Sequence, residues 1–181
     1  GWPAIRFVFP HAPVRPVTIN NGVRMRAWYD IVGMDFPTRA DAEGVEQSIA
    51  QVTALIEREQ ARGISPERIL LAGFSQGGAV TLAAGLRREV PLAGLIALST
   101  YLPGAEKAAR LLGSAATGQP IFMAHGGSDP VIPLMYAERS AQLLESLGFA
   151  VQWQRYSMAH QVCAEEIRDL GDWMTQRFAA A

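Results

Sequence analysis

A serine stands between two glycines in the sequence GFSQG, residues 73–77. This pattern, G-x-S-x-G, is typical of a sharp turn that carries a serine from the end of a strand into a helix and exposes its hydroxyl. An apolar run of strand length precedes Ser75, and a run of small residues follows it. We expect glycine at 73 and 77 because side chains there would collide in so tight a turn. Ser75 is therefore the candidate nucleophile.

A phosphate-binding turn is the alternative interpretation of this glycine-rich stretch, since helix N-termini attract anions. The sequence carries neither the lysine of a P-loop nor the spacing G-x-G-x-x-G. A nucleophilic serine needs a base that takes its proton and a carboxylate that orients the base. In sheet proteins with G-x-S-x-G, the three residues follow in the order Ser, acid, His.

The chain has three histidines, and their positions separate them. His11 precedes the serine, and His125 closes an apolar run, where we expect a buried and hydrogen-bonded role. His160 lies in the loop after the last predicted strand, at the edge of the sheet where the sites of open α/β proteins form. His160 is therefore the candidate general base.

The candidate acid is Asp129, in the stretch HGGSDPVIP. It closely follows the apolar run 121–125, and the two glycines before it allow the chain to bend. A turn-forming aspartate before proline is the alternative role. Glu106 is the nearest competitor, but it lies farther from its strand and beside Lys107, as a solvated residue would. Cys163 lies on the apolar stripe of the last predicted helix, which favours packing over a thiol nucleophile.

Short apolar runs alternate with helical patterns along the chain. Continuous runs suit strands covered on both faces, whereas the alternation in 151–156 suits a less buried strand. The predicted strands are 5–9, 69–73, 93–98, 121–125 and 151–156, and the predicted helical stripes are 45–56, 137–144 and 163–178. We expect the first helix to begin with a capping box from Thr38 to Asp41 and to end at Gly63. This order predicts an α/β fold, a mostly parallel sheet with helices on both faces.

The segment 14–40 has no long periodic pattern. Asn21-Gly22 stands between 17–19 and 23–25, which predicts a tight hairpin with a two-residue turn. Trp28 and Tyr29 follow this hairpin. We expect them to form a wall of the substrate-binding site, with surface packing as the alternative role.

Composition limits the possible functions. A chain of 181 residues suits one domain, 1–181. Its net charge of −1 and its lack of a basic cluster argue against nucleic acid as a partner. The single cysteine excludes a disulfide within these residues and fits the cytoplasm. No run reaches the ~18 apolar residues of a membrane span. We expect no metal or organic cofactor, and we keep a homodimer as one use of the Met and Trp side chains.

The chain resembles a known family, the α/β-hydrolase carboxylesterases grouped with acyl-protein thioesterases and lysophospholipases. It is most similar to the small bacterial carboxylesterases. The stretches that carry the resemblance are FVFPHAPVRPVTINNGVRMRAWYDI, RILLAGFSQGGAV, GLIALSTYLP, HGGSDPVIP and YSMAHQVCAEEIRDLGDWM. The resemblance implies an α/β-hydrolase fold without a cap domain and a triad of Ser75, Asp129 and His160. It also implies that the backbone N–H of Gln76 is one donor of the oxyanion hole.

The front of the chain departs from the family pattern. Members of the family begin with a strand that ends in an L-H-G-x-G type loop, and this loop supplies the second oxyanion donor; neither is present here. In the family's sheet that strand lies between the strands matching 5–9 and 69–73. We therefore expect a chain without its N-terminal segment, or another segment in the gap. Loss of one oxyanion donor lowers turnover by ~10²- to 10³-fold.

The reaction that the resemblance implies is hydrolysis of small acyl esters through an acyl-enzyme on Ser75. An acyl-protein thioesterase or a lysophospholipase would use the same triad and is the first alternative. A hydrolase-like scaffold, catalytically impaired because the oxyanion loop is absent, is the second alternative.

Overall fold

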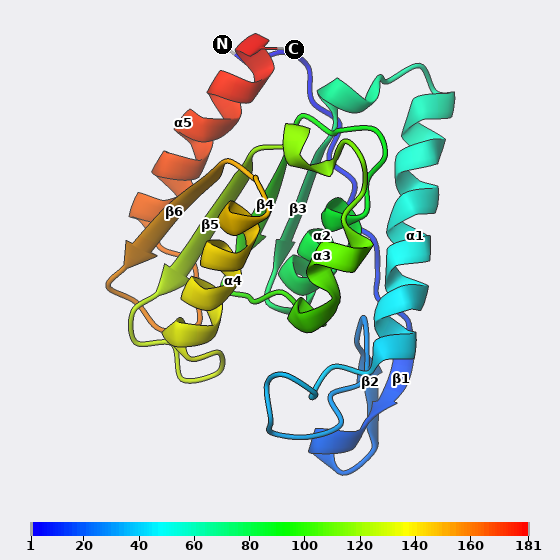
Figure 1. Ribbon diagram of the computed structural model, residues 1–181, viewed down its shortest axis with the longest axis vertical. Coiled ribbons are helices and arrows are strands. Elements are labelled where there is room, and N and C mark those ends of the chain that lie inside the picture. The colour runs from blue at the N-terminus through cyan, green and yellow to red at the C-terminus, as the bar shows by residue number, and fades with distance from the viewer. Residues whose placement is uncertain (1, 181) are drawn as a thin grey trace.

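The centre of the molecule is a parallel sheet of four strands in the order β3-β4-β5-β6, seen in a computed structural model that describes residues 2–180 (Figure 1). All neighbouring strands run parallel, so the predicted α/β arrangement is confirmed. The strands are β3 (Leu70–Phe74), β4 (Gly94–Leu98), β5 (Ile121–Gly126) and β6 (Val151–Tyr156). Parallel strands place their carboxyl ends at one edge of the sheet, and this edge carries the site described below.

Helices cover both faces of the sheet. Helices α1, α2 and α4 lie on one face and α5 lies on the other, as Figure 1 shows. The helices are α1 (Ala42–Ala61), α2 (Gln76–Leu86), α3 (Ala108–Leu111), α4 (Leu134–Ser146) and α5 (Ala164–Ala180). Within residues 2–180, none of these helices combines the length and the apolar character that a membrane crossing requires.

The two central strands are buried along their whole length, because a helical layer covers each face. In β4, Leu95 packs into the core beneath α1, α2 and α4, whereas Ile96 packs into the core beneath α5. In β5, Ile121 likewise packs into the core beneath α1, α2 and α4, and Phe122 packs into the core beneath α5. There Phe122 contacts the ring of Trp173 from α5. Side chains alternate across a strand, so a sheet covered twice needs continuous apolar runs.

Strand β3 differs from the prediction that it is covered on both faces. Within residues 2–180, β3 pairs only with β4. Ala72 is exposed and Phe74 is 39% exposed. The sheet is therefore open at β3, on the side where the sequence led us to expect a gap.

The predicted strand at 5–9 was wrong, because the segment pairs with no strand among residues 2–180. Phe7 and Phe9 are 61% and 84% exposed. Side-chain contacts hold the segment and the residues before it instead. Trp2 Nε1 donates to Thr175 Oγ1 of α5 at 2.7 Å, and Arg6 Nε lies 3.5 Å from Glu59 Oε2 of α1. An extended segment becomes a strand only when a neighbour satisfies its backbone groups, and no neighbour does so here.

The predicted hairpin forms, but its turn is longer than two residues. It joins β1 (Val14–Val17) to β2 (Val23–Arg26), with Val17 opposite Val23. Asn21 and Gly22 provide the positive φ values that reverse the chain, 55° and 75°. Thr18 leaves the ladder because Asp30 accepts hydrogen bonds from its N–H and its hydroxyl.

Helix α1 begins with a simpler cap than predicted. Asp41 is the N-cap, and its carboxylate accepts the N–H of Gly44 at 3.1 Å. The predicted capping box was wrong, because Thr38 donates its hydroxyl to Asp35 instead. The predicted end is confirmed: Gly63 follows the helix with φ 92°, a conformation that favours glycine.

Candidate active site

Ser75 occupies the turn between β3 and α2, in a conformation that non-glycine residues rarely adopt. Its φ is 54° and its ψ is −117°. Three hydrogen bonds fix this backbone: Ser75 N–H donates to Leu98 O, and the carbonyl of Ser75 accepts from Ala79 N–H and from the Thr100 hydroxyl. Because Leu98 ends β4 and Thr100 lies in the loop just after it, the end of the neighbouring strand holds Ser75 at the edge of the sheet.

The glycines around Ser75 are not equivalent. A Cβ at Gly73 would lie 2.1 Å from the backbone of Gly77, so the predicted collision at position 73 is confirmed. A Cβ at Gly77 would meet nothing closer than Trp28 Nε1 at 4.0 Å, so the predicted collision at position 77 was wrong. The second tight position is Gly78, where a Cβ would lie 2.6 Å from Thr100 Cγ2.

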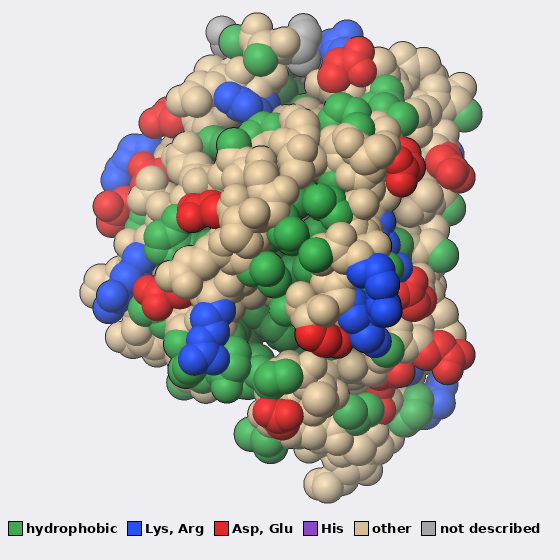
Figure 2. Space-filling model, in the orientation of Figure 1, with side chains coloured by type: hydrophobic (Ala, Val, Ile, Leu, Met, Phe, Trp, Pro, Cys, Tyr) green, Lys and Arg blue, Asp and Glu red, His purple; other side chains and the backbone are tan. Residues whose placement is uncertain are grey.

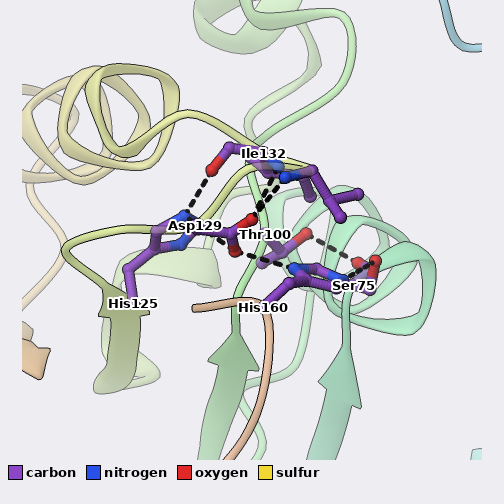
Figure 3. A network of polar contacts seen from close by, with 7 residues as sticks. Ser75, Thr100, His125, Asp129, Ile132 and His160 are labelled. Atoms are coloured by element: carbon purple, nitrogen blue, oxygen red, sulfur yellow. Dashed lines mark hydrogen bonds and ion pairs between the residues drawn. The ribbon is translucent and has the colours of Figure 1, made fainter. Parts of the chain in front are cut away.

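The three candidate catalytic side chains meet at the carboxyl ends of the strands (Figure 3). His160 Nε2 lies 3.1 Å from Ser75 Oγ, and His160 Nδ1 lies 2.7 Å from Asp129 Oδ2. A carboxylate only accepts hydrogen bonds, so Nδ1 carries the hydrogen and Nε2 is free to accept the serine proton. The structure therefore brings together hydroxyl, imidazole and carboxylate in the order that proton transfer requires.

Asp129 is fixed by the backbone of its own loop. Its Oδ1 accepts the N–H groups of Val131 and Ile132 at 2.8 and 2.9 Å, which leaves Oδ2 for His160. Burial acts to raise the pKa of Asp129, but these hydrogen bonds and His160 outweigh burial and lower the pKa below its usual value. The carboxylate is consequently ionised at neutral pH, ready to stabilise a positive charge on His160.

Gln76 is the first residue of α2 and directly follows Ser75, the candidate nucleophile. Within residues 2–180, its backbone N–H has no hydrogen-bond partner. Its side chain is anchored, because the amide oxygen accepts Trp28 N–H at 2.9 Å and the amide nitrogen donates to Tyr29 O at 2.8 Å. The N–H therefore has the place and the freedom that an oxyanion donor needs.

The two aromatic residues expected to line the site differ in exposure. Trp28 is half-buried and near the turn at Gly77. Tyr29 corrects the expectation, because the residue is only 2% exposed and packs in the main core. The carbonyl of Tyr29 accepts a hydrogen bond from Gln76, and its side chain packs in the core instead of lining the site.

Two residues that sequence reasoning missed support the site. Thr100 is the second residue after β4, and its hydroxyl donates to Ser75 O at 2.7 Å. The neighbouring Ser99 has φ 50°, so the chain is also strained where β4 ends. Their place at the carboxyl end of a central strand is the signal that would have found them. The competing acid, Glu106, instead lines a cavity of about 310 Å³ with Tyr101 and Tyr136.

A serine on a strand–helix turn, with aspartate and histidine following in that order on later loops of a parallel sheet, defines a serine hydrolase of the α/β-hydrolase fold. Comparison with known families agrees with this class. Residues 2–177 match the phospholipase/carboxylesterase family, and the chain belongs to this family. It is an enzyme that acts on acyl esters.

Individual relatives are similar over nearly the whole chain. Acyl-protein thioesterase 1 of Neurospora crassa is 40% identical over 181 residues, which cover 96% of this chain and 74% of that protein. The crystal structure of Arabidopsis thaliana SOBER1 is 31% identical with a TM-score of 0.88, covering 94% of this chain and 82% of that one. Zea mays acyl-protein thioesterase 2 is 26% identical with a TM-score of 0.80, covering 93% and 80%.

Proposed function

We propose that the protein hydrolyses small acyl esters with Ser75 as nucleophile, His160 as general base and acid, and Asp129 as the group that orients His160. One observation carries this proposal: the unbroken contact from Ser75 Oγ through the imidazole to Asp129 Oδ2, with distances of 3.1 and 2.7 Å. No metal or organic cofactor is needed for this chemistry, because each proton transfer has a side chain in reach.

The reaction proceeds in two halves. Ser75 Oγ attacks the acyl carbonyl while its proton moves to His160 Nε2, and Asp129 stabilises the resulting imidazolium. His160 then gives this proton to the leaving alkoxide, and the acyl group stays on Ser75. A water molecule loses its proton to His160 and attacks the acyl carbonyl; His160 then gives this proton to Ser75 Oγ as the bond from Oγ to the acyl group breaks, which releases the carboxylic acid.

The negative charge that develops on the acyl oxygen needs hydrogen-bond donors. We assign the backbone N–H of Gln76 as one donor, because it follows the nucleophile and is unpaired within residues 2–180. Trp28, half-buried beside this turn, is the residue we propose as a wall of the substrate site.

We infer that the second donor comes from a further segment beside β3. We propose that an additional strand pairs with the open edge of β3 in the working enzyme, because this edge leaves backbone groups of the sheet unpaired next to Ser75. Without the second donor, a chain of residues 1–181 is expected to turn over ~10²- to 10³-fold more slowly than the completed sheet.

The scaffold alternative is tested by covalent labelling of Ser75. A fluorophosphonate reacts only with a serine that a base activates. We expect the wild-type chain to be labelled at Ser75, whereas Ser75→Ala is not labelled and loses esterase activity. A wild-type chain that stays unlabelled at neutral pH would exclude catalysis by these residues and favour the inert scaffold.

The thioesterase alternative has support of its own, because relatives at up to 40% identity are named acyl-protein thioesterases. Esters and thioesters both suit the triad, so only a comparison of substrates can distinguish an esterase from a thioesterase. We expect kcat/KM to be highest for short-chain oxygen esters in a series of matched esters and thioesters of increasing chain length. Higher values for long-chain thioesters, or for lysophospholipids, would replace the small-ester proposal without affecting the triad.

We also propose that the enzyme works in the cytoplasm on small-molecule esters, without a nucleic-acid partner. Support comes from the free thiol of Cys163 and from the near balance of charges, a net charge of −1. A homodimer stays a prediction, and the mass of the chain in solution, measured by sedimentation, would test it.

A further inference from the structure

A second histidine lies behind the candidate catalytic acid. His125 is the fifth residue of β5, and its side chain is fully buried. Its Nε2 lies 2.8 Å from Ile132 O and 3.4 Å from Asp129 Oδ2, as Figure 3 shows. We propose that His125 is a positioning residue for the reaction, one that keeps Asp129 aimed at His160; this inference rests on the proposed function.

The hydrogen bond to Ile132 decides which form of the ring is present. A carbonyl oxygen only accepts, so His125 Nε2 carries the hydrogen and Nδ1 is left with a lone pair. Nδ1 is buried and has no hydrogen-bond partner within residues 2–180. A second proton would therefore be buried on Nδ1 without an acceptor. Burial lowers the pKa of His125, against the opposing influence of Ile132 O and Asp129, so the ring stays neutral at neutral pH.

Two imidazoles thus flank one carboxylate oxygen, and only one of them can accept a proton during the reaction. His160 lies 2.7 Å from Asp129 Oδ2 and is partly exposed, whereas His125 lies 3.4 Å from the same oxygen and is fully buried. The other charged group that influences His125 is Glu138 of α4. Because His125 stays neutral, the charge of Asp129 remains available for the imidazolium of His160.

His125 also completes the loop that holds the carboxylate. The N–H of Ile132 donates to Asp129 Oδ1 at 2.9 Å, and the carbonyl of Ile132 accepts from His125. Both backbone polar groups of Ile132 are therefore fixed: Asp129 holds the N–H, and His125 of β5 holds the carbonyl. Rotation of the carboxylate away from His160 would require this loop to open. A strand end is a more rigid support than a loop, which explains how the loop keeps the acid in place.

The experiment compares three substitutions of His125. His125→Phe fills the ring's space without a donor, His125→Gln places an amide N–H near the position of Nε2, and His125→Asn places it near Nδ1, out of reach of Ile132. We expect kcat to fall about 10- to 100-fold in His125→Phe and His125→Asn, with KM little changed, because a small misplacement of the acid affects the transition state. His125→Gln should recover most of this loss.

The pH profile separates positioning from stability. In His125→Phe and His125→Asn, the acid limb of kcat/KM should move to lower pH, because the cation of His160 loses its aligned partner. The control is Val52→Ala, at a buried position of α1 that is far from the triad in the sequence. We expect this substitution to lower the stability and to leave kcat and the acid limb of kcat/KM unchanged.

Two results would overturn the proposal. One is a folded His125→Phe or His125→Asn with wild-type kcat and acid limb, and the other is a His125→Gln no better than His125→Asn. If His125→Phe does not fold, the two amide variants decide the question. Failure of the proposed function is distinct, because a wild-type chain would then be neither active nor labelled at Ser75.

Discussion

At the residue scale, the proposed nucleophile Ser75 shows how a disfavoured backbone conformation is maintained. A positive φ at a non-glycine residue costs on the order of 1–3 kcal/mol, and the φ of Ser75 is 54°. Hydrogen bonds from the Thr100 hydroxyl and to Leu98 O offset part of this cost, because they hold the Ser75 backbone against the carboxyl end of β4 and the loop after it. The strain places the hydroxyl above the sheet, where His160 reaches it.

The glycines that flank Ser75 should respond differently to substitution. Gly73→Ala would bring a Cβ to 2.1 Å from the backbone of Gly77, which must then move. We expect a loss of at least about 1–3 kcal/mol in the free energy of unfolding, the usual cost of overpacking, together with a loss of activity. Urea denaturation and the initial rate of ester hydrolysis measure the two effects.

The matched control is Gly77→Ala, in the first turn of α2. Its Cβ would lie 4.0 Å from Trp28 Nε1. Alanine suits a helix better than glycine, so we expect a gain of about 0.4–1 kcal/mol in the free energy of unfolding. Equal destabilisation by the two substitutions would contradict the asymmetry of this turn.

Sequence reasoning placed the three catalytic candidates correctly in space, because G-x-S-x-G fixes the nucleophile and the chain order limits its partners. It could not predict that Tyr29 is buried or that His125 contacts Ile132. Both depend on where long loops settle: segment 27–41 folds back against Gln76 in the first case, and loop 127–133 covers β5 in the second. Such contacts leave no periodic signal in the sequence.

At the element scale, prediction succeeded where burial determines the pattern. Strands β4 and β5 are covered on both faces, so their apolar runs were unambiguous. The alternation in β6 marked a half-covered strand, which the structure confirms. Segment 5–9 has the same apolar character as these strands but pairs with no strand in the described part of the chain, and strand formation depends on a pairing partner as much as on the sequence.

The ends of elements were predicted less well, since local hydrogen bonds compete there. Thr18 pairs with Asp30 and lengthens the hairpin loop, and Thr38 pairs with Asp35 instead of capping α1. Short polar side chains can bond several nearby backbone and side-chain groups, so their sequence spacing alone does not decide between caps and turns.

At the scale of the whole molecule, one buried carboxylate connects stability to pH. Glu166 lies in the first turn of α5 and is fully buried, and neither carboxylate oxygen has a hydrogen-bond partner within residues 2–180. Burial raises the pKa of Glu166 above its usual value. The folded chain therefore keeps this proton to higher pH than the unfolded chain does. The bound proton therefore stabilises the folded chain. This stabilisation is complete below the pKa of Glu166 in the unfolded chain, about 4.3, and is lost as the pH rises through the higher pKa of Glu166 in the folded chain.

Glu166→Gln keeps the shape of the protonated side chain and cannot ionise. We expect it to be more stable than the wild type at pH 8 by about 1–3 kcal/mol, because an ionised carboxylate without a partner costs more to bury than a neutral amide. The difference should shrink towards pH 4. Each 1 kcal/mol corresponds to about 2–4 °C in Tm for a chain of this size, so thermal unfolding across this range measures the effect.

Glu165 provides the control, because it is the preceding residue of the same helical turn but is exposed. Glu165→Gln should show no comparable dependence of Tm on pH. A wild-type chain whose stability relative to Glu166→Gln is the same at pH 4 and pH 8 would contradict the assignment of a raised pKa.

The surface of the molecule carries charged and apolar side chains side by side, as Figure 2 shows for one face. The open side of β3 is a different kind of surface, because its backbone donors and acceptors face outward beside exposed Ala72 and Phe74. Water satisfies these groups less firmly than a β-ladder does, so two molecules that meet along this side can join their sheets around a two-fold axis. Where the additional strand proposed for the working enzyme is absent, we expect two chains to associate along this side of β3.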